Sequence, residues 1–465
     1  MIRWTAVLLL VAASCACSRL PTRSESRVAL IRRLEPTERL IVAAVDNRTT
    51  PFLASAGGTP RAYDGLSAYG PTPRSLRTMH AIAREYGLRE VTAWPIEPLD
   101  LHCAVLETAV GVDRDAVLAR LVEDPRIKLA QPLQTFSTRT SLPPDSRPTG
   151  GTPATSGAAG VLYNDPYVGL QRGFAQMNVA GAHPWSTGAG VTIAIVDTGA
   201  DTRHPDLRGS IATTANFVDD DADQFRRDRH GTEIAGVIAA VANNHQGIVG
   251  VAPRARLAIF KACWQIRADA DAANCNSFTI ARALVASLAA RAQVVNLSLA
   301  GPDDPLLRDL IREGSRRGIV FVGAAARDRQ NLMRQPGLIE VASAEGVGEV
   351  DATASQGEPS PVVLRAPGRE ILTLMPDGHY DFASGDSIAT AEVSGVVALL
   401  LGEVPNLSTA AARKILLETS RRAGAAANFR GGEGLDAGID ACAAVAALGG
   451  HGGCADGFER RVASH

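Results

Sequence analysis

The stretch 191–199, which reads VTIAIVDTG, decides the fold of this chain. It is an almost continuous apolar run that ends in an acid, Asp197, followed by a turn glycine, Gly199. Such a run is typical of a strand buried on both faces, as in parallel sheets covered by helices. In these sheets the chemistry sits at the carboxyl ends of the strands, so Asp197 is a candidate site residue, although an acid there is often a helix cap or a metal ligand.

Short apolar runs alternate with helical patterns on the C-terminal side of this strand. The runs cover residues 191–196, 257–260, 294–299, 319–322 and 338–342, and the helical patterns cover 232–242, 278–291, 305–317, 388–401 and 409–419. This alternation predicts an α/β domain over residues 161–450, with a parallel sheet and helices on both faces.

A smaller domain is predicted upstream, over residues 38–137. Strand patterns at 38–45, 91–95, 101–106 and 128–132 and helical patterns at 75–86 and 113–122 follow the order β-α-β-β-α-β, which is the ferredoxin-like plan. Residues 20–37 are polar and rich in Arg, and we expect a tether there. Residues 138–160 are rich in Pro, Gly, Ser and Thr, which indicates a linker exposed to proteolysis.

The first 16 residues have the pattern of a secretory signal. Arg3 precedes an apolar run, 4–13, that is too short to span a bilayer and is followed by small residues. Cys15 and Cys17 each follow small residues, as the lipidated cysteine of a bacterial lipoprotein does; the alternative is an ordinary signal cut after Ala16. We therefore expect an exported protein, either periplasmic, anchored at the cell-surface membrane through lipid, or secreted.

Export changes what the remaining cysteines indicate. Cys263 with Cys275, and Cys442 with Cys454, form two short-range pairs, while Cys103 stands alone. In an oxidising compartment each pair can close a loop of about a dozen residues, worth roughly 3 kcal/mol. The alternative is four free thiols, and metal binding is disfavoured because no C-x-x-C motif accompanies them.

Two further motifs carry chemistry. Residues 230–236 (HGTEIAG) open a helix of small residues with His230, and residues 384–395 (SGDSIATAEVSG) place Ser387 at the start of an almost wholly apolar helix. That helix must be buried, and its N-terminus presents free N–H groups beside the hydroxyl. A serine needs a base to take its proton, and the base needs an acid to hold its tautomer. Asp197, His230 and Ser387 supply these three parts of a nucleophilic triad.

The order and local contexts of the three motifs resemble the subtilisin-like serine proteases, themselves a reference case for the triad mechanism. The resemblance covers about residues 163–445. It implies a serine endopeptidase that hydrolyses peptide bonds through an acyl-enzyme and needs no cofactor for catalysis. Ser298, Leu299 and Ala300 look like the family's substrate-channel segment. The small domain looks like a propeptide, which in relatives chaperones folding, inhibits the active site through its C-terminal tail and is cut away; the alternative is an independent binding module.

The sequence departs from the family pattern beside the nucleophile. Relatives supply one oxyanion donor from the serine N–H and one from an Asn side chain, but here Arg327 stands at that position and Asn331 follows four residues later. Losing such a donor costs about 10²–10³ in rate, a magnitude that comes from subtilisin itself. Donation by Arg327, donation by Asn331 and an incomplete, slow site are the three alternatives. Asp386 either raises the pKa of His230 or caps the helix.

Three residues stand where relatives hold calcium. Asp206 follows the first motif, Asn244 lies in the loop 241–247, and Asp165 lies near the start of the domain. Ca²⁺ prefers six or more oxygen ligands, some of them backbone carbonyls. A structural Ca²⁺ is therefore weighed against a plain turn in which His204 and Asp206 are solvated.

Composition and net charge indicate which kinds of partner the chain binds. The chain has 465 residues, 46% of them hydrophobic, and a net charge of −2, which indicates a globular protein without a nucleic-acid partner. We expect a monomer that binds peptides or proteins. The rival function is a degenerate subtilisin relative, weakly active or inactive, that binds peptides at the surface; an esterase with the same nucleophile is a second rival.

Overall fold

The computed structural model describes residues 26–48, 70–138, 163–265, 272–325, 331–344, 363–426, 438–452 and 454. The predicted signal with Cys15 and Cys17, the linker beyond Thr138, and Arg327 lie outside these residues. Within the described part of the chain, no helix is both long enough and apolar enough to cross a membrane.

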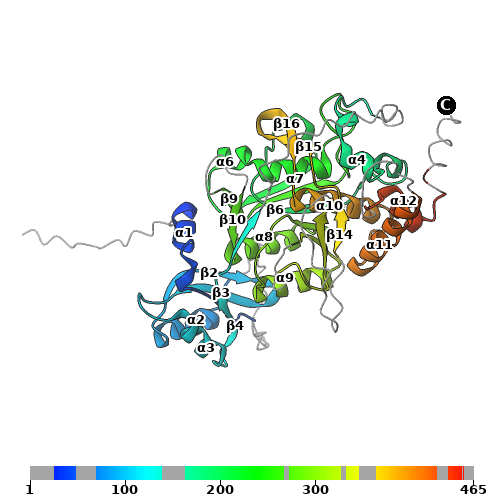
Figure 1. Ribbon diagram of the computed structural model, residues 1–465. Coiled ribbons are helices and arrows are strands. Elements are labelled where there is room, and N and C mark those ends of the chain that lie inside the picture. Colours follow the sequence, from blue (N-terminus) through cyan, green and yellow to red (C-terminus); the bar gives the residue numbers. More distant parts are fainter. Residues whose placement is uncertain are drawn as a thin grey trace, which may run out of the picture.

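A parallel sheet forms the centre of the larger domain, as its apolar runs predict (Figure 1). Its strands are β6 (Thr192–Asp197), β7 (Ile211–Asn216), β8 (Arg256–Lys261), β11 (Val294–Leu297), β12 (Val320–Ala324), β13 (Leu338–Ser343) and β14 (Leu364–Ala366). They lie in the order β14-β13-β12-β11-β6-β8-β7, and the neighbouring pairs are parallel.

Helices cover both faces of this sheet because successive strand residues point to opposite sides. Ile193 and Ile195 of β6 pack in one apolar cluster, and Ala194 and Val196 pack in another. The first face carries α7 (Arg229–Ala239) and α10 (Asp386–Glu403), with α12 (Ala441–Gly449) packed beside α10 and α11 (Thr409–Ala426) packed beside α12. The second face carries α8 (Ser277–Ala289) and α9 (Pro305–Arg316).

Shorter elements surround the sheet. They are α4 (Arg172–Gln176), α5 (Val179–Ala182), α6 (Ala222–Arg227) and the hairpin of β15 (Ile371–Met375) with β16 (His379–Ala383). The hairpin lies against α7, where a Cβ on Gly236 would stand 2.5 Å from Leu374 Cγ. Glycine at this position therefore lets the helix and the hairpin approach closely.

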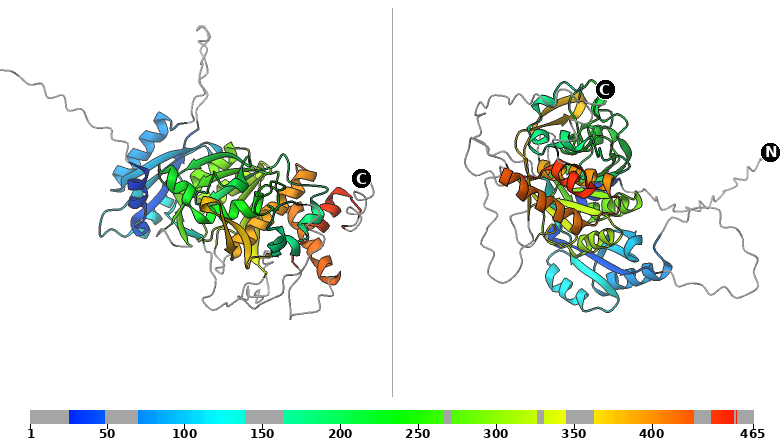
Figure 2. Two further views of the ribbon diagram at one scale, coloured as in Figure 1. Left: turned by 90° about the horizontal axis from the view of Figure 1, so that it is seen from above. Right: turned by 90° about the vertical axis from the view of Figure 1, so that its right-hand side faces the viewer.

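The small domain has the predicted ferredoxin-like plan. It consists of β1 (Leu40–Asp46), α2 (Pro73–Glu85), β2 (Arg89–Ile96), β3 (Leu101–Glu107), α3 (Arg114–Val122) and β4 (Ile127–Pro132). The sheet order is β2-β3-β1-β4, and its pairs are antiparallel. Figures 1 and 2 show this domain at one end of the molecule, beside α8 and α9.

The two faces of the small sheet have different neighbours. Ile41 and Val45 of β1 pack with the small domain's own helices, whereas Val42 and Ala44 belong to the apolar cluster that contains α8 and α9. Trp94 of β2 meets the ring of Phe278 on α8 edge to face, with centroids 4.7 Å apart. The larger domain therefore covers a face that the small domain cannot bury by itself.

The expectation of a tether over residues 20–37 is wrong for its second half. Residues Arg27–Leu34 form helix α1, whose Ile31 and Leu34 are buried in the cluster shared with the larger domain. Arg27 Nη1 donates to the backbone oxygen of Asn216, the last residue of β7, at 2.5 Å. The four arginines and two glutamates between residues 20 and 37 obscured the apolar side of this helix in the sequence.

The small domain sends one more strand into the larger one. Strand β5 (Thr135–Thr138) leaves the small sheet and pairs with β10 (Ala273–Asn276), which in turn pairs with β9 (Cys263–Gln265). No alternating pattern marks these four residues, so this strand is not predicted from the sequence.

Candidate active site

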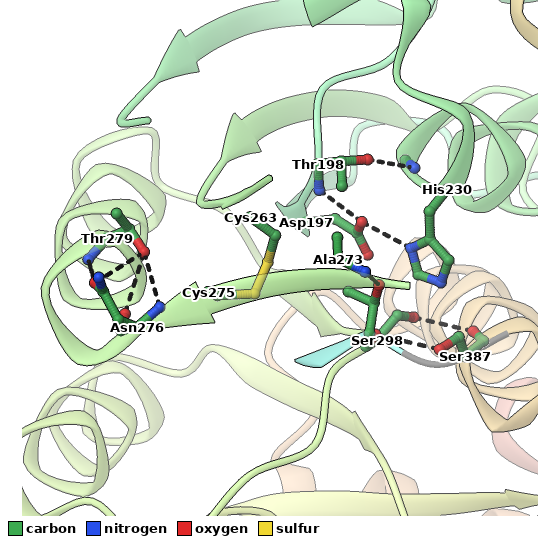
Figure 3. The surroundings of a disulfide bond; sticks show 12 residues. Asp197, Thr198, His230, Cys263, Ala273, Cys275, Asn276, Thr279, Ser298 and Ser387 are labelled. Carbon is green, nitrogen blue, oxygen red and sulfur yellow. Dashed lines mark hydrogen bonds and ion pairs between the residues drawn. A yellow bond between two sulfur atoms is a disulfide. The ribbon is translucent and has the colours of Figure 1, made fainter. Parts of the chain in front are cut away.

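Asp197 and His230 meet at the carboxyl end of β6. Asp197 Oδ1 lies 2.7 Å from His230 Nδ1 and accepts the backbone N–H of Thr198 at 2.6 Å (Figure 3). His230 is the second residue of α7, and Gly231 lets that helix reach the turn after β6, because a Cβ there would stand 2.3 Å from Gly199 O. Both side chains are buried.

The pair fixes the tautomer of the imidazole. An ionised carboxylate only accepts, so His230 donates from Nδ1 and keeps Nε2 as its basic nitrogen. Burial lowers the pKa of His230, but the charge and hydrogen bond of Asp197 outweigh that effect, and the net pKa is raised. Nε2 is buried and has no hydrogen-bond partner among the described residues.

Ser387 is the second residue of α10. Gly385 precedes the helix with φ +143°, a conformation that a side chain disfavours. Ser387 Oγ donates to Ser298 O at 3.2 Å, and the Ser298 hydroxyl donates to Ser387 O at 2.9 Å. These bonds tie the start of α10 to the segment that follows β11, where Figure 3 shows Ser298 and Ser387 below the ring of His230.

Strand β5 runs beside this segment. The backbones of Ser137 and Ala300 exchange two hydrogen bonds of 2.9 Å, and Ala273 N donates to Thr138 Oγ1 at 3.1 Å. Phe136 is buried against Gly301, where a Cβ would lie 2.1 Å from its ring. Thus β5 lies between β10 and the segment 298–301, pairing antiparallel with both, as a peptide strand laid along a cleft would.

Comparison with known proteins identifies the family. The model of the subtilase family matches residues 188–434, more than half of the chain. This chain belongs to the subtilase family.

Relatives agree with this assignment. The chain is 31% identical over 335 residues to a thermophilic serine proteinase of Bacillus sp. (strain AK1), covering 70% of this chain and 76% of that protein. It is 32% identical over 248 residues to thermitase of Thermoactinomyces vulgaris, covering 52% and 85%. The solved structure of fervidolysin from Fervidobacterium pennivorans superposes with a TM-score of 0.63 at 21% identity, covering 88% of this chain and 61% of that one, and so supports the fold.

The chain is thus a subtilisin-like serine endopeptidase that acts on peptide substrates. Of the predicted channel residues of this subtilase, Ser298 and Ala300 make the contacts given above, and Leu299 is buried in the cluster with α8 and α9. Sequence reasoning missed Phe136 and strand β5. In the structure this strand lies next to Asn276 and Ser277, at the start of α8.

The structure describes one of the two oxyanion candidates, Asn331. Arg327 is outside the described residues. Asn331 Oδ1 accepts the N–H groups of Met333 and Arg334 at 2.9 and 3.2 Å, so this oxygen caps a turn. Asp386 Oδ1 accepts the N–H of Ser343 at 2.7 Å, which ties the start of α10 to the end of β13.

A buried ion pair supports the histidine helix, and sequence reasoning missed it. Lys261 Nζ at the end of β8 lies 2.5 Å from Asp228 Oδ2, and both side chains are almost fully buried. Asp228 immediately precedes α7 and also accepts the N–H of Gly199 at 2.8 Å. Lys261 stands beside Asp197 in the sheet register, so the pair fixes the start of α7 relative to β6. A lysine ending an apolar strand was the available signal.

The three calcium candidates converge on one loop. Asn244 Nδ2 donates to Asp206 Oδ1 at 2.7 Å, and Asn243 N donates to Asp165 Oδ2 at 2.8 Å. Burial raises the pKa of Asp206 to about 6, with Asp165 adding to the effect. Two carboxylates and a carboxamide are donors that Ca²⁺ takes, and a cation would offset the cost of burying Asp206, so these residues fit the ion. The described residues hold no group of three or more His, Cys, Asp or Glu that could bind a metal by themselves.

Both predicted cysteine pairs are disulfides. Cys263 on β9 is joined to Cys275 on β10, and Cys442 on α12 is joined to Cys454. Cys103 is free and buried, and burial raises the pKa of its thiol.

Proposed function

We propose that this subtilase cleaves peptide bonds through Asp197, His230 and Ser387. The Ser387 hydroxyl turns from Ser298 O to His230 Nε2, gives up its proton and attacks the peptide carbonyl, and water then hydrolyses the acyl-enzyme. Asp197 holds Nδ1 and stabilises the imidazolium. The observation that carries this proposal is the buried 2.7 Å contact between Asp197 and His230 beside a serine at a helix N-terminus.

The small domain, residues 38–137, acts as an inhibitory propeptide in this proposal. Its support is strand β5, which fills the edge of β10 and pairs with Ala300. Antiparallel register matches Ser137 to residue 300, so the position two residues after Ser137 corresponds to Ser298, whose carbonyl accepts from Ser387 Oγ. We therefore expect processing at the peptide bond that follows Arg139 in the sequence.

The Ser387 backbone N–H is the first oxyanion donor, and Arg327 or Asn331 supplies the second. The guanidinium of Arg327 carries five N–H donors, and the carboxamide of Asn331, whose oxygen caps the turn, carries two. Replacement of the true donor by Ala should lower kcat by about 10²–10³ with little change in KM. Replacement of the other residue should leave kcat within a few-fold, which separates the two candidates.

Export completes the proposal. The signal pattern and Cys15 or Cys17 support a lipid-anchored precursor, and cleavage of the segment after Thr138 would release a monomeric catalytic domain from its anchor. Full-length chain found intact in the membrane of cells that show the activity would contradict this release. A structural Ca²⁺ held by Asp165, Asp206 and Asn244 belongs to the same proposal.

The intact mass of purified protein tests whether Ser387 acts as the nucleophile. Wild type and Ser387→Ala are each made without the signal. We expect wild type alone to be cut after Arg139, because only it has the nucleophile. If both chains stay whole, labelling with a fluorophosphonate decides the matter: a labelled wild type is an active enzyme awaiting another protease, and an unlabelled one favours the degenerate peptide-binding alternative.

A further inference from the structure

Strand β10 depends on few neighbours. It has four residues, and it pairs with β5 on one edge and with the three residues of β9 on the other. If β5 leaves after processing, β10 keeps only β9 within this small sheet. A two-stranded ribbon of that length is marginal in water. Something else must hold β10 in place for an incoming peptide.

The Cys263–Cys275 disulfide is placed to do this. Both cysteines are fully buried, and they oppose each other in the β9–β10 register. Cys263 follows Ala262, whose N–H donates to Asp197 O at 2.7 Å. Cys275 stands opposite Phe136 in the β5–β10 register. The disulfide therefore connects the backbone at the catalytic acid to the strand along which β5 lies, as Figure 3 shows.

We propose that the Cys263–Cys275 disulfide is a positioning element for extended peptide substrates. It holds β10 in register for the residues that precede the scissile bond, which take the places of Phe136, Ser137 and Thr138 and the position that follows them. The enzyme then favours substrates with about four residues on that side, because each backbone hydrogen bond to β10 adds affinity. This inference rests on the proposed function, in which β5 occupies the substrate's place.

The second disulfide is a matched control. Cys442–Cys454 has the same sequence separation of 12 residues, so the loop-entropy model assigns both bridges the same contribution to stability. Cys442 faces α5, where a Cβ on Gly181 would lie 3.0 Å from its sulfur, and it belongs to the cluster on the other face of the sheet. Removing it costs stability without touching β10.

The experiment compares two substrates on full chains made without the signal and allowed to process. One is acetyl-Phe-Ser-Thr-Arg 4-nitroanilide, which copies residues 136–139, and the other is acetyl-Arg 4-nitroanilide. In Cys263→Ser/Cys275→Ser we expect KM for the long substrate to rise about tenfold, the equivalent of roughly one or two lost hydrogen bonds, with kcat/KM for the short substrate unchanged within about twofold. Cys442→Ser/Cys454→Ser should keep the wild-type ratio between the substrates.

A second arm covers failure of the double variant to fold or to process. Cys442→Ser/Cys454→Ser is activated first and then treated with dithiothreitol, which reduces Cys263–Cys275 to two thiols as the reagent becomes its cyclic disulfide; thiol counting follows the reaction. The same rise in KM, reversed by reoxidation, supports the proposal. An unchanged KM with the disulfide open, or equal losses on both substrates, overturns it. A wild type that turns over the short substrate yet gains nothing from the longer one refutes the placement of β5, and a wild type inactive on both refutes the proposed function and this inference together.

Discussion

Asp197 acts on His230 in a direction that can be measured. Its charge and hydrogen bond raise the pKa of the imidazole against the opposing effect of burial. Because the base must be neutral to accept the serine proton, kcat/KM should rise with pH through a midpoint above the ordinary histidine value of about 6.5. Asp197→Asn should move that midpoint down and lower kcat. Rates between about pH 5 and 9 on processed enzyme test this; an unmoved midpoint in the variant would contradict it.

Lys261 should matter more for stability than any surface ion pair. Lys261→Met leaves the carboxylate of Asp228 buried without its cation, which should cost about 3–5 kcal/mol of unfolding free energy. Urea unfolding in the Ser387→Ala background, which prevents self-digestion, measures the loss. Arg312→Ala removes an exposed pair with Asp309 and should cost about 0–1 kcal/mol. Equal losses in the two variants would show that the buried pair has no special weight.

At the scale of residues, the local pattern predicts the three candidate catalytic residues but not the ion pair that supports His230. Asp197, His230 and Ser387 each stand in a short motif that indicates the secondary structure around it, such as an acid after an apolar strand or a serine at the start of a buried helix. Lys261 and Asp228 are separated by 33 positions and carry no motif, so only the folded sheet brings them together.

Strand β5 is the element through which the small domain reaches the candidate active site. Phe136 is buried beside Gly301, and Phe136→Ala should remove about 3–5 kcal/mol of that contact. Intact mass shows when processing is complete, and the quantity compared is the delay from then until activity appears. In Phe136→Ala this delay should be at least about 100-fold shorter than in wild type, since each 1.4 kcal/mol is tenfold.

The control for this prediction is Val110→Ala, a change at a side chain that is 85% exposed in the same domain. It should leave the delay unchanged. A delay that Phe136→Ala does not shorten would show that the tail contributes little to inhibition.

Helix α1 shows why element prediction failed in one place. Its eight residues are too few for a stable isolated helix. The helix is stabilised because the larger domain and β2 bury Ile31 and Leu34, and because Arg27 donates a hydrogen bond to the backbone oxygen of Asn216. Propensity could not predict a helix whose stability comes from that contact.

At the scale of the molecule, Asp206 links the loop 241–247 to β16, because Asn244 Nδ2 and Tyr380 Oη both donate to it, at 2.7 and 3.4 Å. Its pKa is raised by burial from 3.8 to about 6, so without metal the folded state holds the proton more tightly than the unfolded state. Stability from this group is therefore full below about pH 4 and is lost as pH rises through about 6.

Asp206→Asn should remove that dependence. In EDTA and the Ser387→Ala background, wild type should lose up to about 3 kcal/mol relative to the variant between about pH 4 and 7. With excess Ca²⁺ at neutral pH the order should reverse, because the ion pairs with the carboxylate. Urea unfolding at each pH measures both effects, and parallel pH curves without metal would refute the first.

The sequence by itself determined the architectures of the two domains, the order of the three catalytic candidates and the cysteine pairs, because each can be recognised from local periodicity, a short motif or a short spacing. Only the tertiary structure decided where β5 goes, that the small sheet buries its second face on α8 and α9, and that Lys261 supports the start of α7. Those contacts join residues far apart in the chain, and they form because apolar faces and charges left over by each element must be covered or paired by another.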